Sequence, residues 1–235
     1  MAVTAGKADI VDVVAEKTGM TKQDAGDGMF LESTIATGRS AATMAAPRDD
    51  EGWRKEITSL LMRGSSLVVI DNVVGRLYAP SLAAAITART WEDRLLGRSA
   101  MVSVPQRAVW VATGNNIQLG GDLPRRCYWI RLDAHRARPW QRHPATFRHP
   151  QLSPWVRAER GRILAAILTL ARAWVVADRP SPAHPPRLGG FEEWANVVGG
   201  VLTIPPVDGF LGNLDALYEQ ADCERPQWEA FFQRW

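Results

Sequence analysis

The segment L-V-V-I-D-N-V (67–73) decides the fold that we predict for this chain. Its four apolar residues form a short continuous run that ends at Asp71, and Ser65-Ser66 precede it. Such a run, without polar alternation, is typical of a strand buried on both faces of a parallel sheet. Because parallel strands bring their carboxyl ends to one edge of a sheet, we expect the Asp71 carboxylate at that edge.

The segments on both sides of this run alternate between helix and strand. A helix is predicted to begin at Asp49 or Asp50, to present Trp53 and Ile57 on one face, and to end at Gly64. A second helix is predicted over 81–88, introduced by a proline at position 80. Further strands are predicted over 101–104, 108–113 and 127–132. This alternation indicates an α/β sheet.

The remaining segments are predicted to be a loop and a set of helices. The stretch 37–50 is small and polar, which favours a linker or surface loop. A long amphipathic helix is predicted over 153–176, after a proline- and arginine-containing loop. Shorter helical pieces are predicted near 191–198, 211–220 and 227–235. The chain ends within an amphipathic pattern, so we expect a C-terminal part to be missing.

Composition excludes several classes of protein. The chain has 235 residues, of which 46% are hydrophobic and 23% charged, as in an ordinary globular protein. No apolar run approaches the roughly 20 residues that a membrane helix needs, and Asp9 and Asp12 interrupt any secretory signal. We therefore expect a cytoplasmic location and no membrane partner. Two cysteines, Cys127 and Cys223, form neither a disulfide framework nor a zinc quartet.

Three segments could together carry phosphate chemistry. A carboxylate at Asp71 could hold the water shell of Mg²⁺, and the amide of Asn115, after V-W-V-A-T (109–113), could orient a water. The pair Arg125-Arg126 could reach a phosphate of a neighbouring subunit. Each segment also has an ordinary explanation: an acid that caps a turn, an asparagine turn, and a solvated pair of charges.

From Ile35 to about Trp194, the chain resembles the ATPase domain of phage-type and plasmid-type replication proteins. These form the primase-helicase group related to superfamily 3 helicases and to the AAA+ class. The resemblance rests on I-A-T-G-R-S-A (35–41), D-D-E-G-W-R-K-E-I-T-S-L-L (49–61), L-V-V-I-D-N-V (67–73), W-E-D-R-L-L-G-R-S (91–99), P-Q-R-A-V-W-V-A-T-G-N-N (105–116) and R-R-C-Y-W-I-R-L-D (125–133).

This resemblance implies a role for each matching residue. Asp71 would be the Walker B acid, which binds the nucleotide's Mg²⁺ through water. Asn115 would be the sensor that faces the γ-phosphate, with Asn116 as the runner-up. Arg126 or Arg125 would be the arginine finger offered to the next subunit of a ring. The cofactors of the family are therefore ATP and Mg²⁺.

The same resemblance implies a contact with DNA. Arg94 and Arg98 belong to W-E-D-R-L-L-G-R-S (91–99), which lies where these ATPases have a loop near the central channel. Two guanidinium groups there could contact the phosphate backbone of DNA. The expected partners are thus DNA and an intact, ring-forming homologue.

One required motif is missing from the sequence. A working member of the family needs a phosphate-binding loop, G-x-x-x-x-G-K-[ST], ahead of the first helix. Gly6-Lys7 is the only Gly-Lys pair, and Ala8 follows where Ser or Thr must ligate Mg²⁺. Because this loop supplies most of the hold on the triphosphate, we predict little or no ATP hydrolysis. The alternative to the family's ATP and Mg²⁺ is a chain that binds no cofactor.

The N-terminal segment resembles a different family. K-A-D-I-V-D-V-V-A-E-K-T-G-M-T-K-Q-D-A (7–25) and D-G-M-F-L-E-S (27–33) are similar to the opening helices of the bacterial histone-like HU/IHF proteins. In that family these helices build mainly the dimer core. We therefore predict an HU-like helical hairpin over 1–34, a truncated ATPase core over 35–135, and a helical lid or C-terminal region over 136–235.

The predicted fold is α/β: an incomplete P-loop NTPase-like parallel sheet with an N-terminal helical hairpin and a C-terminal helical region. Losing the first strand and its loop could leave an open edge in that sheet. The predicted function is that of a remnant of a DNA-replication ATPase. The alternative is a non-enzymatic DNA-binding or dimerising protein that uses the HU-like hairpin. A third hypothesis is an interfering subunit that docks on an intact ring.

Overall fold

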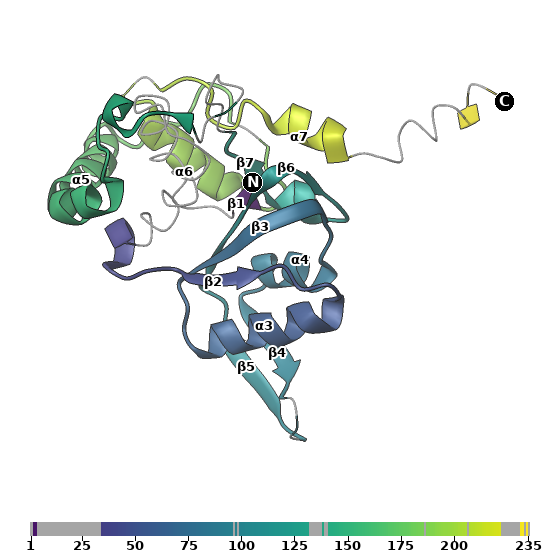
Figure 1. Cartoon of the computed structure of the whole chain (residues 1–235). Helices are drawn as coiled ribbons and strands as arrows, with labels where there is room; N and C mark the ends of the chain where they lie inside the picture. Colours follow the sequence, from purple (N-terminus) through teal and green to yellow (C-terminus); the bar gives the residue numbers. More distant parts are fainter. Residues whose placement is uncertain are drawn as a thin grey trace.

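The computed structural model describes residues 2–3, 34–95, 97, 99–131, 138, 141–185, 187–205, 207–221, 231–232 and 234. Within these ranges the chain is a mixed α/β structure (Figure 1). The helical hairpin predicted over 1–34 falls, apart from residues 2–3 and 34, outside the described residues. The predicted helix over 227–235 also lies largely outside them.

The main sheet has five strands in the order β2-β3-β6-β1-β7. Strands β2, β3 and β6 run parallel, whereas β1 runs antiparallel to both β6 and β7. The α/β prediction with a parallel sheet is therefore confirmed for the three strands β2, β3 and β6. The strands are β1 (Ala2–Val3), β2 (Ala42–Ala45), β3 (Leu67–Leu77), β6 (Val109–Leu119) and β7 (Tyr128–Trp129).

Helix α3 (Asp50–Met62) precedes β3 and forms as the sequence predicts. The Asp49 side chain accepts a hydrogen bond of 2.7 Å from the Gly52 amide, which satisfies one of the free N–H groups at the helix start. Trp53 and Ile57 are buried on one face. Gly64 adopts a φ of 69°, the left-handed conformation that commonly follows a helix end.

Helix α4 (Pro80–Thr87) leads into a two-stranded antiparallel hairpin of β4 (Thr90–Arg94) and β5 (Met101–Pro105). Figure 1 shows this hairpin extending away from the main sheet, beyond α3. The strand over 101–104 was expected, but its partner β4 was not. The hairpin thus converts the arginine-containing segment at 91–99 into a projection of the molecule.

The second half of the chain supplies three helices, α5 (Leu152–Val176), α6 (Glu192–Leu202) and α7 (Leu214–Ala221). They lie on the side of the sheet away from α3 in Figure 1. Leu188, Leu214 and Leu217 belong to the same buried cluster as the sheet residue Trp110. Among the described residues, no helix combines the length and the apolar character required to cross a membrane.

Three predicted boundaries are wrong. The loop expected over 37–50 contains β2, which pairs in register with β3 from Ala42↔Val68 to Ala45↔Asp71. Its alternating burial on the outer edge of the sheet produces too weak a pattern to stand out among small residues. The strand expected over 127–132 is reduced to Tyr128–Trp129, because β1 offers only two residues to pair with it.

The third error concerns the ends of β3 and β6, which the sequence places at Asp71 and at Thr113. Both strands continue, to Leu77 and Leu119, in a ladder with two register shifts. Asn72 and Asn116 take left-handed φ angles of 54° and 52°. These asparagines accommodate β-bulges in the two strands rather than turns that end them.

Candidate functional site

The side chain of Asp71 lies exposed on β3 and is tied to the neighbouring strand. The Thr113 hydroxyl on β6 donates a hydrogen bond of 2.6 Å to an Asp71 carboxylate oxygen. The backbone amide of Asn72 donates to the Thr113 hydroxyl oxygen at 2.9 Å. The bulge at Asn72 therefore places an acid and a hydroxyl side by side on adjacent parallel strands, and we call Asp71 and Thr113 the acid–hydroxyl pair.

Asn115 lies two residues beyond Thr113 on β6, opposite Val74 of β3. Two residues of a strand span roughly 7 Å, and alternate residues share a face. Asn115 and Asn116 are both exposed, and Asn116 occupies the left-handed position of the bulge in β6. The structure thus places the predicted acid and the predicted sensor amides on the neighbouring strands β3 and β6, with Asp71 bonded to Thr113 and Asn115 paired with Val74.

The position of this pair differs from a strand end. Asp71 is an interior residue of β3, whose eleven residues run on to Leu77. Strand β2, however, stops at Ala45, directly opposite Asp71. Asp71 therefore marks the point where the three-stranded part of the parallel sheet ends and β3 continues with β6 alone.

Arg126 is bonded inside the chain. Its guanidinium group donates to the backbone carbonyl of Ala83 at 2.5 Å and to the Thr87 hydroxyl, and it forms an ion pair with Asp122. These contacts tie Arg126 to the last turn of α4, where a positive charge is favourable near the carboxyl end of the helix dipole. Arg126 is therefore held against α4 and η1 by bonds within the chain.

Arg125 is exposed at the end of the short 3-10 helix η1 (Leu123–Arg126). Its backbone approaches Gly189 so closely that a Cβ atom there would lie 3.3 Å from the Arg125 carbonyl oxygen. Burial raises the pKa of the Tyr218 hydroxyl on α7, as does Asp215, and the charge of Arg125 partly offsets this rise. Both arginines thus make their contacts with α4, η1, Gly189 and α7, away from the acid–hydroxyl pair.

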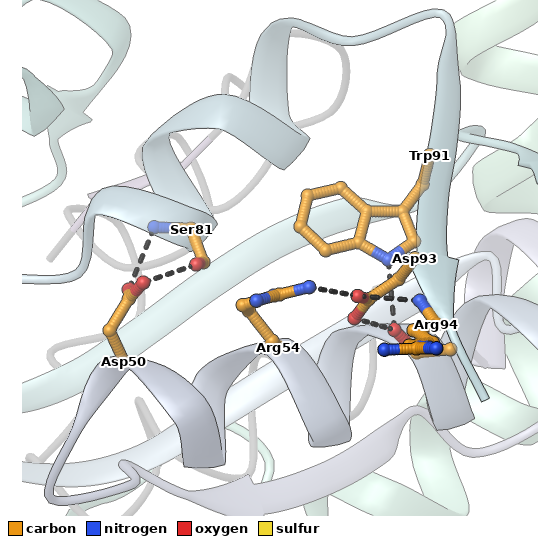
Figure 2. Close-up of polar contacts among 7 residues, drawn as sticks. Asp50, Arg54, Ser81, Trp91, Asp93 and Arg94 are labelled. Carbon is orange, nitrogen blue, oxygen red and sulfur yellow. Dashed lines mark hydrogen bonds and ion pairs between the residues drawn. The ribbon is translucent and has the colours of Figure 1, made fainter. Parts of the chain in front are cut away.

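A second polar cluster lies where the hairpin meets α3 (Figure 2). The Asp93 carboxylate on β4 accepts hydrogen bonds from the Thr58 hydroxyl at 2.9 Å, from the Arg94 amide at 2.8 Å and from the Arg54 guanidinium group. The Trp91 indole donates to the Thr58 hydroxyl oxygen at 2.9 Å. We call these groups, with Asp93 at their centre, the hairpin root.

The hairpin root is almost closed to solvent, since Asp93 is only 5% exposed. Burial opposes ionisation of Asp93, but the hydrogen bonds from Arg94, Arg54 and Thr58 outweigh it and hold the pKa of the carboxyl below its usual value. Next to this cluster, Asp50 at the start of α3 accepts bonds from the Ser81 amide and hydroxyl of α4, at 2.9 and 2.6 Å. The bonds of Asp93 therefore anchor the hairpin to α3, and those of Asp50 join α4 to α3.

The sequence did not reveal the hairpin root. Arg54 and Thr58 are separated by one helical turn, and Trp91 and Asp93 alternate as strand residues do. These two spacings were a usable signal, but only the pairing of β4 with β5 shows that the four side chains face one another.

Of the two arginines assigned to DNA, the structure describes Arg94. Arg94 is exposed on β4 and is paired with Met101 of β5, which is 68% exposed. The neighbouring cross-strand pair is bridged by a hydrogen bond of 3.2 Å from the Ser103 hydroxyl to Glu92. Arg98 lies outside the described residues.

The residues present do not fit a tightly bound Mg²⁺–ATP. Lys7, Lys17, Lys22 and Lys55 are the only lysines, and Lys55 is paired with Glu51 at 2.6 Å. In a P-loop protein, a strand leads directly into the glycine-rich loop and then a helix. Here β1, between β6 and β7, is a two-residue strand running opposite to β6, and no such motif follows it in the sequence.

Comparisons with known proteins do not identify the chain: no protein-family model, curated protein or solved structure matches it. From the geometry alone, the candidate site consists of the acid–hydroxyl pair with Asn115, together with the projecting hairpin and its root.

Proposed function

We propose that this chain is a non-hydrolysing remnant of a phage- or plasmid-type DNA-replication ATPase, which acts by contacting DNA. The observation that carries the proposal is the acid–hydroxyl pair, in which Asp71 and Thr113 face each other on adjacent parallel strands. Asn115 on the same strand as Thr113 supplies the amide expected of a sensor. The sequence resemblance likewise assigns an acid and an amide to two neighbouring strands, although in the structure both residues lie within strands that continue beyond them.

Loss of hydrolysis follows from the groups that would have to grip the triphosphate. The phosphate-binding loop is missing from the sequence, and Arg126 is held by Ala83, Thr87 and Asp122. A carboxylate alone can hold the water shell of a metal ion, but it repels a triphosphate. The remaining groups therefore support a role for the chain that does not depend on turnover.

Contact with DNA is assigned to the hairpin of β4 and β5. It projects from the body (Figure 1) and carries Arg94 at the end of β4, and Arg98 lies in the sequence between β4 and β5. The hairpin root fixes the hairpin on α3, so that little conformational freedom is lost when its arginines bind a phosphate backbone. Guanidinium groups suit this role because they stay charged and donate two bonds at once.

The experiment measures the binding of labelled single-stranded DNA to the whole chain over a series of salt concentrations. Each phosphate contact on single-stranded DNA contributes about 0.7 to the slope of log K against log salt. Removing both hairpin arginines, as Arg94→Ala with Arg98→Ala, should therefore weaken binding and flatten the slope by about 1.4.

The matched control removes the same charge elsewhere, as Arg157→Ala with Arg172→Ala on the exposed side of α5. This control should change affinity far less than the hairpin variant. Equal losses of affinity in the two double variants would mean that net charge, and not the hairpin, binds the DNA.

An intact ring ATPase of the same class is the proposed protein partner, because Arg125 is exposed and could serve as the finger while Arg126 is held internally. Co-purification of the two chains that depends on Arg125 supports this pairing, and its absence ends it. The alternative, DNA binding or dimerisation through the HU-like segment, concerns residues outside the described ranges. A variant that lacks residues 4–33 and keeps β1 distinguishes DNA binding by the α/β body from DNA binding by the HU-like segment. We expect this variant to bind DNA as the unchanged chain does.

A further inference from the structure

A second exposed feature lies at the far end of β3, beyond the acid–hydroxyl pair. Tyr78 directly follows β3 and is 59% exposed. The Arg76 guanidinium carbon lies 6.0 Å from the centre of the Tyr78 ring, within the range of a cation–π contact. Neither residue takes part in the hairpin or in the hairpin root.

Two glycines after β6 form the seat for these side chains. A Cβ atom on Gly120 would lie 2.5 Å from the Arg76 Nε atom, and one on Gly121 would lie 3.0 Å from the Tyr78 ring. Gly121 also has a φ of 62°, which disfavours other residues. Arg76 and Tyr78 therefore lie against bare backbone on one side, while Tyr78 keeps most of its surface open to solvent.

The surroundings of this seat are mostly polar. Gln118 pairs with Arg76 across the ladder, and Asn115 pairs with Val74, which is 86% exposed. Beyond the acid–hydroxyl pair, the exposed residues of β3 and β6 other than Val74 are amides, glycines and an arginine. A protein interface would centre on a continuous apolar core, whereas an aromatic ring among cationic and amide groups is typical of surfaces that bind single-stranded nucleic acid.

We propose that Tyr78 and Arg76 form a contact site for single-stranded nucleic acid, with a base stacked on the Tyr78 ring and a phosphate paired with Arg76. The amides of Gln118 and Asn115 would face the edges of neighbouring bases. The inference rests on the proposed function for the class of partner, but it adds a site on β3 and β6 that is separate from the hairpin.

The experiment measures the affinity of the full chain for a labelled oligothymidylate of about 16 nucleotides, the upper end of common site sizes. Stacking contributes about 1–3 kcal/mol for each base, so Tyr78→Ala should weaken binding roughly tenfold. Tyr78→Phe keeps a ring that can stack and should stay within about threefold of the unchanged chain. Arg76→Gln should flatten the salt slope by about 0.7, and Arg76→Lys should preserve it.

Leu168→Ala provides the control, because Leu168 is an exposed apolar residue on α5, 66% open to solvent. Unchanged unfolding curves for Tyr78→Ala would confirm that the variant remains folded. If Tyr78→Ala binds as the unchanged chain does while the hairpin variant does not, this site is excluded and the proposed function stands. If the unchanged chain does not bind the oligonucleotide, both fail. If Tyr78→Ala alters only self-association, the surface is a protein interface and the inference is overturned.

Discussion

The hairpin root and the acid–hydroxyl pair each centre on an aspartate, but they treat it in opposite ways. Asp93 is 5% exposed and its two oxygens are bonded by Thr58, Arg54 and the Arg94 amide. Asp71 is exposed and receives one hydroxyl, that of Thr113. An acid whose bonds are completed by the protein stabilises the fold, whereas an acid with open oxygens can bind something else.

This difference separates residues that hold the fold from residues that can act. The same contrast appears in the arginine pair, where Arg126 is bound to α4 and to Asp122 and Arg125 faces solvent. Substituting a residue that holds the fold should therefore lower the free energy of unfolding more than substituting a residue that can act.

The largest loss of stability is expected from Asp93→Ala. Removing this carboxylate leaves the Thr58 hydroxyl and the Arg54 guanidinium group without their acceptor, so the free energy of unfolding should fall by about 2–3 kcal/mol. Unfolding in urea measures it. Glu92→Ala, next along β4 and exposed, is the matched control and should cost at most about 0.5 kcal/mol. Equal costs would erase the distinction between the two regions.

The contribution of Asp93 should also appear in the pH dependence of the free energy of unfolding. Because the pKa of Asp93 is lower in the folded chain than its ordinary value of 3.8, its contribution is complete above that value. It is lost as the pH falls below 3.8 through the lower folded pKa. The unchanged chain should therefore lose stability in this range more steeply than Asp93→Asn, and parallel curves would contradict the assigned bonds.

A smaller effect is expected from Arg126→Ala, which removes the bonds between Arg126 and the last turn of α4. Loss of the charge-assisted bonds to Ala83 and Thr87 should cost about 1–2 kcal/mol. Arg125→Ala, one residue earlier and exposed, should cost about 0.5 kcal/mol or less. Thermal unfolding of the two variants distinguishes them, and a costlier Arg125→Ala would reverse the roles given to the pair.

The smallest effect is expected from Asp71→Ala. The Thr113 hydroxyl left behind can bond to water, so the change in free energy of unfolding should stay within about 0.5 kcal/mol. A loss comparable to that of Asp93→Ala would show that Asp71 is part of the structural framework. The acid–hydroxyl pair would then have no claim to function.

The sequence predicted what depends on local pattern. The apolar run at 67–70 predicted the parallel strand β3, and the cap at Asp49 predicted the start of α3. Strand β2 escaped notice because small residues at an edge give no clear alternation. The hairpin root escaped because it depends on the meeting of α3 with β4, and no local pattern records which distant residues pair.

The acid–hydroxyl pair could be predicted from the sequence only in part. Asp71 and Asn115 were selected from the sequence because each follows an apolar run, and the structure places them on the adjacent strands β3 and β6, with Asn115 opposite Val74. The bulges at Asn72 and Asn116 were missed, since an asparagine with a left-handed φ can bend a strand or end it. Arg126 was chosen as a finger, but its bonds to α4 depend on a tertiary contact.

We propose that this chain keeps the acidic strand of a replication ATPase but acts without hydrolysing ATP. The most direct test compares steady-state phosphate release from ATP, in the presence of DNA and Mg²⁺, between the unchanged chain and Asp71→Ala. The account predicts the same background rate for both chains, with DNA still bound. Sustained turnover by the unchanged chain that disappears in Asp71→Ala would contradict it.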